Sequence, residues 1–304
     1  MRITFNMMAN RALNNMTSTA ERLMEAQDRV SSGKRIRKPS DDVTGTGRAL
    51  SLRSTISEIE QYLRNSDMVK SQLSVTNSAM DSVVTSLERV QEIALLAANS
   101  PVPVEARPAL TTELGEIMLS LAAAGNMQYG DRYIFGGSIT NQPPIVSSGV
   151  TMPPYSYAGN DTQISVQVAP WTNTTCNAVG SAVFNMSGAA VPTSPDVFST
   201  IQLLKEEIEA GNLTAVSARI ADIEANLKNV ITIRSEVGAR TSRLENISES
   251  LLDSKTSLST LLSETEDADL TQAVLELRTR ENVYQAAVSV AGRILNITLA
   301  DYIK

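Results

Sequence analysis

The sequence contains no histidine, one cysteine and few aromatic residues, and each shortage excludes a class of function. Without histidine the chain lacks the usual general base and the commonest zinc ligand. The single cysteine, Cys176, can form neither an internal disulfide nor a cysteine-based metal cage. Aromatic residues make up 4% against 42% apolar residues, which is typical of packed helices built from Leu, Ile, Val, Ala and Met. These shortages favour a protein that is not an enzyme and that has no cofactor or metal.

Positive charge and long apolar runs are also scarce. The net charge of −7 argues against nucleic-acid binding, which needs a basic face. No apolar run reaches the roughly 18 residues that a membrane span requires, so no membrane partner is expected. Met1-Arg2-Ile3-Thr4 leads into a polar stretch without the apolar segment of a signal peptide. The sequence therefore predicts a soluble protein, either cytosolic or exported without a cleaved signal.

Apolar residues recur at helical period in residues 1–100 and again in roughly 198–304. In the first half, steps of four and three predict a helix over 44–99 that ends where two prolines follow Ser100. A second helix is expected over about 105–128. An extra step of three residues after Ser66 separates two series of apolar residues, and such an insertion predicts a locally overwound coiled coil. The two series are Leu52, Ile56, Ile59, Leu63, Ser66 and then Val69, Leu73, Thr76, Met80, Val83, Leu87, Val90, Ala94, Ala97.

The second half shows the same period. Ser194-Pro195 predicts an N-cap and the first residue of a helix that runs to about Ala210, before a Gly211-Asn212 turn. Acidic residues interrupt the stripe over 264–269, and Asp269 with Gln272 resembles a capping box that opens a last helix. The stripe before this interruption comprises Val216, Ile220, Ile223, Leu227, Val230, Val237, Leu244, Leu251 and Leu258.

Residues 141–197 are rich in Pro, Gly, Ser, Thr and Asn. Polar and apolar residues alternate over Thr162–Val168, which predicts a strand after a turn at Gly159-Asn160-Asp161. Further short strands are expected at about Thr174–Val179 and Ala182–Phe184. This composition predicts a small β module between the two helical halves.

The predicted fold class is mainly α, or α+β overall: a long coiled-coil rod formed by both halves of the chain with a small inserted β domain. Three domains are expected. Residues 1–40 with 266–304 form a terminal coiled coil, 41–140 with 198–265 form a helical rod, and 141–197 form a β domain. The residues predicted to pack the rod are Arg89, Val90, Glu92, Val237 and Leu244.

The terminal stripes define a predicted assembly interface. The last helix is expected to pair with the first, and both are expected to be mobile in a free monomer because a pair of helices buries too little apolar surface to offset its ordering entropy. The interface residues are Leu13, Met16, Ala20, Leu23 and Val30, with Leu270, Val274, Leu277, Tyr284, Val288, Ala291, Leu295 and Tyr302.

Three weaker motifs have simpler explanations. Ser31-Ser32-Gly33-Lys34 resembles the end of a phosphate-binding loop but lacks the earlier glycine. The basic run Lys34, Arg35, Arg37 and Lys38 could bind a polyanion, although a solvated connector offset by Asp41-Asp42 is favoured. Glu264 to Asp269 lacks the ligand spacing of a calcium loop, so a helix break is favoured there.

Several segments, taken in order, resemble the bacterial flagellins and their junction relatives. On the amino-terminal side these are residues 29–36, 39–45 and 87–94, and on the carboxyl-terminal side 233–240 and 266–270. Within that family, residues 130–137 followed by Pro143-Pro144 resemble the junction members, since flagellins proper do not usually carry this element. The more basic Lys34-Arg35 is a modest departure from many relatives.

The resemblance implies a structural subunit of the bacterial flagellum, secreted through the flagellar type III apparatus. Identical copies would form a ring, with another hook-associated protein on the hook side and flagellin on the filament side. The β domain would face outward, and an export chaperone would hold the carboxyl-terminal helix. Two alternatives remain open: the filament subunit itself, and an intracellular helical scaffold protein.

Overall fold

The computed structural model describes residues 5–99, 103–149, 152–186 and 195–302, with side chains for 7–293 of these ranges. Long helices dominate the described chain, and the predicted mainly helical fold with a small β region is confirmed. The helices are α1 (Phe5–Ser32), α2 (Val43–Asn99), α3 (Arg107–Gly125), α4 (Gly180–Phe184), α5 (Val197–Ala210), α6 (Leu213–Glu266) and α7 (Leu270–Tyr302). The strands are β1 (Gln128–Tyr129), β2 (Arg132–Tyr133), β3 (Ile145–Ser147), β4 (Tyr155–Tyr157), β5 (Ser165–Ala169) and β6 (Thr172–Thr175).

The chain divides into two compact units, residues 1–58 with 254–304 and residues 59–253. Unit 1 holds α1, α7 and the adjoining ends of α2 and α6. Unit 2 holds the remainder of α2 and α6 with everything between them. The boundaries between the two units fall within α2 and α6, which are continuous helices. Because two units do not test a division into three domains, the three-domain division stays a prediction.

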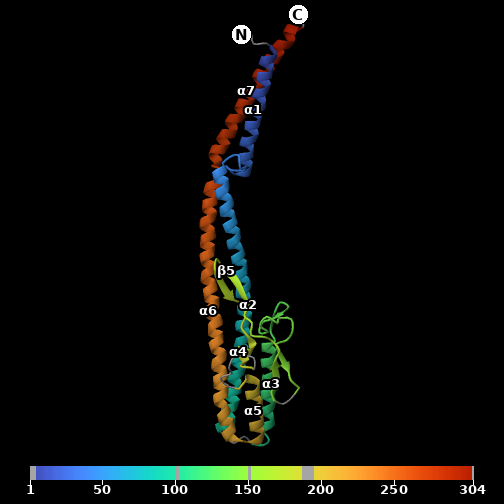
Figure 1. Ribbon diagram of the computed structural model, residues 1–304, viewed down its shortest axis with the longest axis vertical. Helices are drawn as coiled ribbons and strands as arrows, with labels where there is room; N and C mark the ends of the chain where they lie inside the picture. Colours follow the sequence, from blue (N-terminus) through green and yellow to red (C-terminus); the bar gives the residue numbers. More distant parts are fainter. Residues whose placement is uncertain (1–4, 100–102, 150–151, 187–194, 303–304) are drawn as a thin grey trace. The chain divides into compact units, whose positions relative to one another are not determined.

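In unit 2, α2 and α6 run antiparallel and side by side (Figure 1). Lys70 Nζ lies 2.8 Å from Glu245 Oε1, Arg234 Nη1 lies 2.8 Å from Asp81 Oδ1, and Gln91 Nε2 donates to Glu224 Oε1. Residue numbers on α6 fall as those on α2 rise, by nearly equal steps. The predicted stripe from Val69 to Ala97 is confirmed, since every member is at most 2% exposed.

The core of unit 2 draws on five helices, α2 to α6, and on the β region. α3 packs against α5, and Leu114, Leu121, Ile201 and Leu204 share one cluster with the α2 and α6 stripes. Phe184 stands between Phe135 and Phe198, with ring centroids 5.8 Å and 5.7 Å away. Aromatic residues are few, and these three are fully buried together in this core.

The β region consists of three antiparallel hairpins, β1–β2, β3–β4 and β5–β6. They share the helical core, because Ile134 directly after β2, Ile145 of β3 and Val168 of β5 lie in the same buried cluster as the helices. The first hairpin turns through Gly130, whose φ of 59° favours glycine. The sequence placed the β module at 141–197, whereas the strands begin earlier, at Gln128.

Two local predictions were wrong. Ala182–Phe184 was expected to be a strand but belongs to helix α4, because Gly180, Ser181, Val183 and Phe184 are all buried, a spacing that an alternating strand cannot give. The second concerns the start of α5: Asp196 is the N-cap, and its side chain accepts a hydrogen bond from Ser199 N at 2.8 Å. A carboxylate serves this purpose as well as the expected serine hydroxyl. Ser194 itself lies outside the described residues.

In unit 1, α1 and α7 lie side by side (Figure 1), as the paired stripes predict. α6 ends at Glu266, within the predicted interruption, and α7 begins at Leu270. Asp269 Oδ1 accepts hydrogen bonds from Thr271 N at 2.8 Å and Gln272 N at 3.2 Å, so the predicted cap is confirmed. No helix in the described part of the chain is long and apolar enough to cross a membrane.

Candidate assembly surface and its junction

The contact between α1 and α7 follows a narrow seam. On α1 the half-buried or buried positions recur by three and four residues, and on α7 the corresponding series runs from Ala273 to Ala291. Most seam side chains are small, so the two backbones approach closely while little apolar surface is buried. The seam comprises Ala9, Ala12, Met16, Thr19, Leu23, Ala26 and Val30 on α1, with Ala273, Leu277, Arg280, Tyr284, Ala287 and Ala291 on α7.

Larger apolar side chains flank this seam and remain exposed. On α7 the exposed fraction is 56% for Leu270 and 64% for Leu275. This set of exposed residues is called the apolar flank below. It consists of Met7, Met8, Leu13 and Met24 on α1, with Leu270, Val274, Leu275, Val283, Val288 and Val290 on α7. So many large exposed apolar residues on two paired helices are typical of a surface used for protein association.

Unit 1 has almost no core of its own. Within its described residues, the buried apolar side chains are Ile36 and four alanines: Ala26, Ala49, Ala273 and Ala291. Unit 2 instead buries phenylalanines, leucines and isoleucines throughout. Each buried large aliphatic or aromatic side chain contributes about 1.5–3 kcal/mol, so unit 1 lacks the main source of folding free energy. The apolar flank is the surface that could supply it on association.

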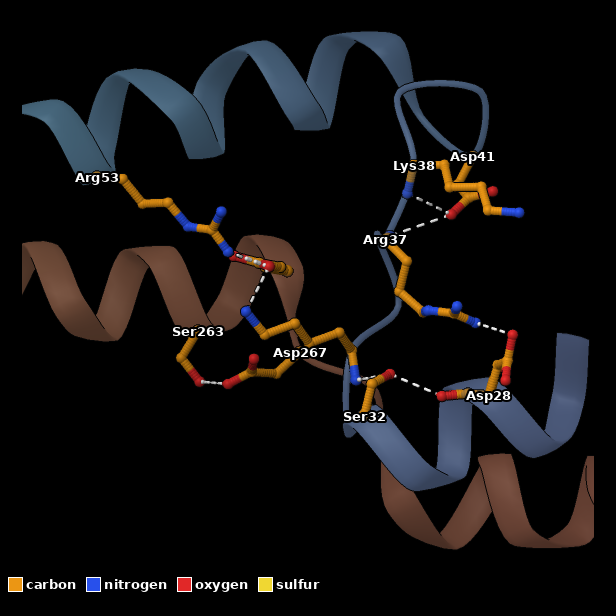
Figure 2. Close-up of polar contacts among 10 residues, drawn as sticks. Asp28, Ser32, Arg37, Lys38, Asp41, Arg53, Ser263 and Asp267 are labelled. Carbon is orange, nitrogen blue, oxygen red and sulfur yellow. Dashed lines mark hydrogen bonds and ion pairs between the residues drawn. The ribbon is translucent and has the colours of Figure 1, made fainter.

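Glu266 joins the two connectors of unit 1. Its side chain is 7% exposed, and Oε1 lies 2.8 Å from Lys34 Nζ and also accepts a hydrogen bond from Arg53 Nη2. A buried carboxylate needs such partners to offset its desolvation. Figure 2 shows Arg53 reaching from the first turns of α2 to the end of α6. We call Lys34, Arg53 and Glu266 the junction triad.

Backbone hydrogen bonds reinforce the triad. Glu266 O accepts from Arg35 N at 2.7 Å, and Gly33 O accepts from Ala268 N at 2.9 Å. Lys34 and Asp267 form an isolated antiparallel bridge between these bonds. Gly33 has a φ of 67°, the left-handed conformation that ends α1 and turns the chain toward this bridge. The α1–α2 and α6–α7 connectors are therefore held together as one piece.

The basic run is a largely exposed connector, as the sequence led us to expect, since Arg35, Arg37 and Lys38 are exposed. Most of its side chains also make contacts within unit 1. Arg35 Nη2 donates to Thr265 O at 2.8 Å, and Arg37 Nη1 lies 2.7 Å from Asp28 Oδ2. Asp41 Oδ2 accepts from Lys38 N and Arg37 N (Figure 2), and these backbone bonds hold the pKa of Asp41 below its usual value. Three of the four basic side chains thus pair within unit 1 and are not offered to a polyanion.

The structure separates the predicted assembly residues into two groups. Met16, Leu23, Val30, Leu277, Tyr284 and Ala291 lie in the α1–α7 seam, and half-buried Ala20 lies beside it. Leu13, Leu270, Val274 and Val288 belong to the exposed flank. The side chains of Leu295 and Tyr302 lie outside the described residues. A single α7 stripe was expected, but its members divide between two faces.

The predicted rod residues also differ in location. Val90, Val237 and Leu244 are at most 1% exposed and pack between α2 and α6. Arg89 and Glu92 lie on the surface, where Arg89 Nε donates to Glu113 Oε1 of α3 at 2.7 Å and Arg89 Nη1 to Glu92 Oε2. These carboxylates raise the pKa of Arg89. Arg89 thus links α2 to α3 rather than packing in the rod core.

Sequence reasoning missed the junction triad. Glu266 stood in a run of acids and Arg53 in an ordinary helical stretch, and 213 residues separate them. A basic run after the first helix and an acidic run before the last were both noted. The contact would have been predicted only if the basic run had been paired with the acidic run, which lies far away in the sequence. Within the described residues, no group of three His, Cys, Asp or Glu side chains could hold a metal ion.

Paired terminal helices that leave large apolar residues uncovered are typical of subunits that associate with other chains. Comparison with known proteins identifies the family. The bacterial flagellin N-terminal helical region matches residues 3–140, and the C-terminal helical region matches residues 220–303. Together these matches cover well over half of the chain, which therefore belongs to the bacterial flagellin family.

Individual relatives match over nearly the whole length. The chain is 25% identical to flagellar hook-associated protein 3 of Salmonella typhimurium, over 97% of this chain and 98% of the relative. It is 24% identical to flagellin of Listeria innocua, over 96% and 95%. A solved flagellar hook-associated protein of Vibrio parahaemolyticus has a TM-score of 0.67 at 24% identity, covering 75% of this chain and 100% of that one. The last likeness establishes a shared fold.

Proposed function

We propose that the chain is a non-enzymatic structural subunit of the bacterial flagellum that forms a ring between the hook and the flagellin filament. The observation that carries this proposal is the poverty of the unit 1 core, where Ile36 is the only large apolar side chain buried among the described residues. Such a unit gains its stability from neighbours. The full-length similarity to a hook-associated protein supports neighbours at the hook–filament junction.

The mechanism is assembly of identical copies by heterologous contacts. One surface of a copy meets a different surface of the next, and closure of the rotation gives a ring. The α1–α7 pairs pack against one another and cover the apolar flank, while the outward β region stays at the rim. The two axial faces differ: one receives another hook-associated protein, and the other receives flagellin.

The proposed function includes secretion, which requires that the apolar flank be covered before assembly. Before it leaves the cell through the flagellar export apparatus, the chain exposes the apolar residues of α7 to water. A chaperone groove that accepts an amphipathic helix would cover Val274, Val288 and their neighbours before assembly. Full-length similarity to flagellin keeps the filament subunit as the competing function.

The test substitutes one residue of the flank. Val288 is 42% exposed in the single chain, and neighbouring copies would bury it in the assembly. Val288→Asp therefore places a charge in the proposed contact. We expect the variant to fold, with an unchanged helical circular dichroism spectrum, but to be absent from isolated flagella. Leu119→Asp, on α3 of unit 2 at a 57% exposed leucine, is the matched control and should assemble. Leu295→Asp, predicted from the sequence, should behave like Val288→Asp.

Two outcomes would count against the proposal. Normal flagella containing the Val288→Asp chain would show that the flank is not an assembly surface. An image of the flagellum at subunit resolution separates the two functions: a single layer between hook and filament is expected. Thousands of copies along the filament would identify the chain as the filament subunit.

A further inference from the structure

The hairpin β5–β6 ends in Trp171, the only tryptophan of the chain, and this side chain is 100% exposed. Pro170 and Trp171 form a two-residue turn, since Ala169 pairs with Thr172. Trp171 has a φ of 61°. A turn with proline first and a positive φ second normally carries glycine or asparagine at the second position. A bulky residue there strains the backbone, and the fully exposed side chain makes no packing contact within the described part of the chain that would offset this strain.

The hairpin presents this tryptophan on a firm base. Val168 is fully buried in the core of unit 2, and Thr174 is 1% exposed. Asn65 Nδ2 of α2 donates to Gln167 O at 2.8 Å, and Arg243 Nη2 of α6 donates to Thr174 Oγ1 at 3.0 Å. An exposed aromatic side chain on an anchored hairpin requires little backbone ordering on binding, which suits it to the centre of an interface.

A hollow of about 420 Å³ lies elsewhere on unit 2, between α2, the β1–β2 hairpin and the base of β5–β6. Its size lies within the range of about 300–1,000 Å³ that small-molecule sites occupy. Ile134 and Cys176, which are 2% and 4% exposed, are its buried apolar residues. Burial raises the pKa of the Cys176 thiol, so the floor remains neutral.

The lining of the hollow matches the chemistry of an indole. Arg132 supplies a cation that can lie over an aromatic face, and Met68 supplies a polarisable thioether. Asp131 supplies an acceptor for the indole N–H. Met68 and Tyr129 are 48% and 36% exposed, so the hollow is open to an incoming group.

We propose that Trp171 of one copy inserts into the hollow of a neighbouring copy, as a side contact within the assembled ring. Trp171 does not fill the hollow of its own chain, because its side chain is fully exposed. Two unlike surfaces that fit each other form a heterologous contact, which is the kind that builds rings. This inference rests on the proposed assembly of identical copies, and it assigns one contact of that assembly to named residues.

The experiment places a photo-reactive phenylalanine analogue at position 171 of the full chain, in cells that assemble flagella from it. Irradiated flagella should yield a covalent dimer of the chain. The adduct should map to the lining of the hollow in the second copy, which is residues 68–72, 129–140, 164–166 and Cys176. The same analogue at position 119, another exposed apolar site of unit 2, is the control and should not label these residues. Thr140→Trp fills the hollow of the neighbour and should abolish the dimer.

The outcomes separate this inference from the proposed function. Trp171→Ala should weaken association between copies by about tenfold or more, whereas Trp171→Phe should retain most of it. An adduct on another flagellar protein, an adduct elsewhere on the chain, or no adduct in flagella that contain the chain would each overturn the contact. None of these results would disturb the ring itself. Absence of the chain from the hook–filament junction would instead overturn the proposed function.

Discussion

Arg53, near the start of α2, pairs with the buried carboxylate of Glu266 at the end of α6, across 213 residues of sequence. Lys34 meets the same carboxylate oxygen from the α1–α2 connector. The Glu266 side chain therefore joins three segments: the end of α6, the first turns of α2 and the α1–α2 connector.

Glu266→Gln should loosen the junction. The substitution keeps the size of the side chain but removes the charge that Lys34 and Arg53 share. We expect the free energy of unfolding of unit 1 to fall by about 1–3 kcal/mol. Amide exchange should quicken at Arg35 and Ile36, whose N–H groups donate to Glu266 O. Hydrogen-exchange mass spectrometry measures this, with Glu264→Gln, at an exposed site of α6, as the control. Equal exchange in the two variants would contradict the role of the triad.

Amide exchange in the free monomer should be faster in α1 and α7 than in the middle of α2 and α6. Local opening is easiest where little apolar surface is buried, and the seam buries mostly alanines. The Val69–Ala97 stripe should exchange slowest, because its residues are almost wholly buried. Slow exchange throughout α1 and α7 in dilute monomer would show that the pair is stable without neighbours. Exchange in assembled flagella should be slow in both helices.

Phe198→Ala should destabilise unit 2 strongly. Phe198 is fully buried and contacts Phe184 and Tyr155, with ring centroids 5.7 Å and 4.7 Å away. Removal of a buried phenylalanine typically costs about 3–5 kcal/mol. Urea unfolding followed by a unit 2 probe measures the loss, and Leu119→Ala at the surface should change it by less than about 0.5 kcal/mol. A small effect of Phe198→Ala would mean that the aromatic cluster does not organise the core.

Tyr157 should make unit 2 sensitive to alkali. Burial, with the charge of Asp161, raises the pKa of Tyr157 from its ordinary value of 10.0 to about 12. The folded chain keeps this proton where the unfolded chain has lost it, so the contribution to stability is full below pH 10 and declines until about pH 12. The Tyr157 hydroxyl lies 2.8 Å from Phe135 O. Tyr157→Phe should be less stable at pH 7, and its deficit relative to wild type should shrink between pH 10 and 12. A constant deficit across that range would refute this account.

The helices and their ends were largely predictable because their signals are local. Apolar residues spaced by three and four marked α2 and α6, two prolines marked the end of α2, and Asp269 with Gln272 marked the start of α7. The prediction failed at Ala182–Phe184, where a short apolar run fits a strand and a helical turn equally well. There the choice depended on Phe135 and Phe198, which pack on both sides of Phe184.

The candidate site was predictable in part. The terminal stripes identified α1 and α7 as partners, but the stripe on α7 contained both seam and flank residues. Leu277 and Val288 look alike in sequence, and only the rotation of α7 against α1 makes one half-buried and the other exposed. The charged residues of the junction were noted individually. Their pairing could not be deduced, because the chain between Arg53 and Glu266 must first fold back on itself.

The sequence by itself determined the two helical arms, the breaks between them and the family resemblance, because helical period, caps and prolines act over a few residues. The tertiary structure decided which side chains those arms leave uncovered. It buried Glu266 between two cations, left Trp171 in full contact with solvent and formed a hollow beside the base of its hairpin. These features arise where segments far apart in the chain meet, and no local pattern specifies such a meeting.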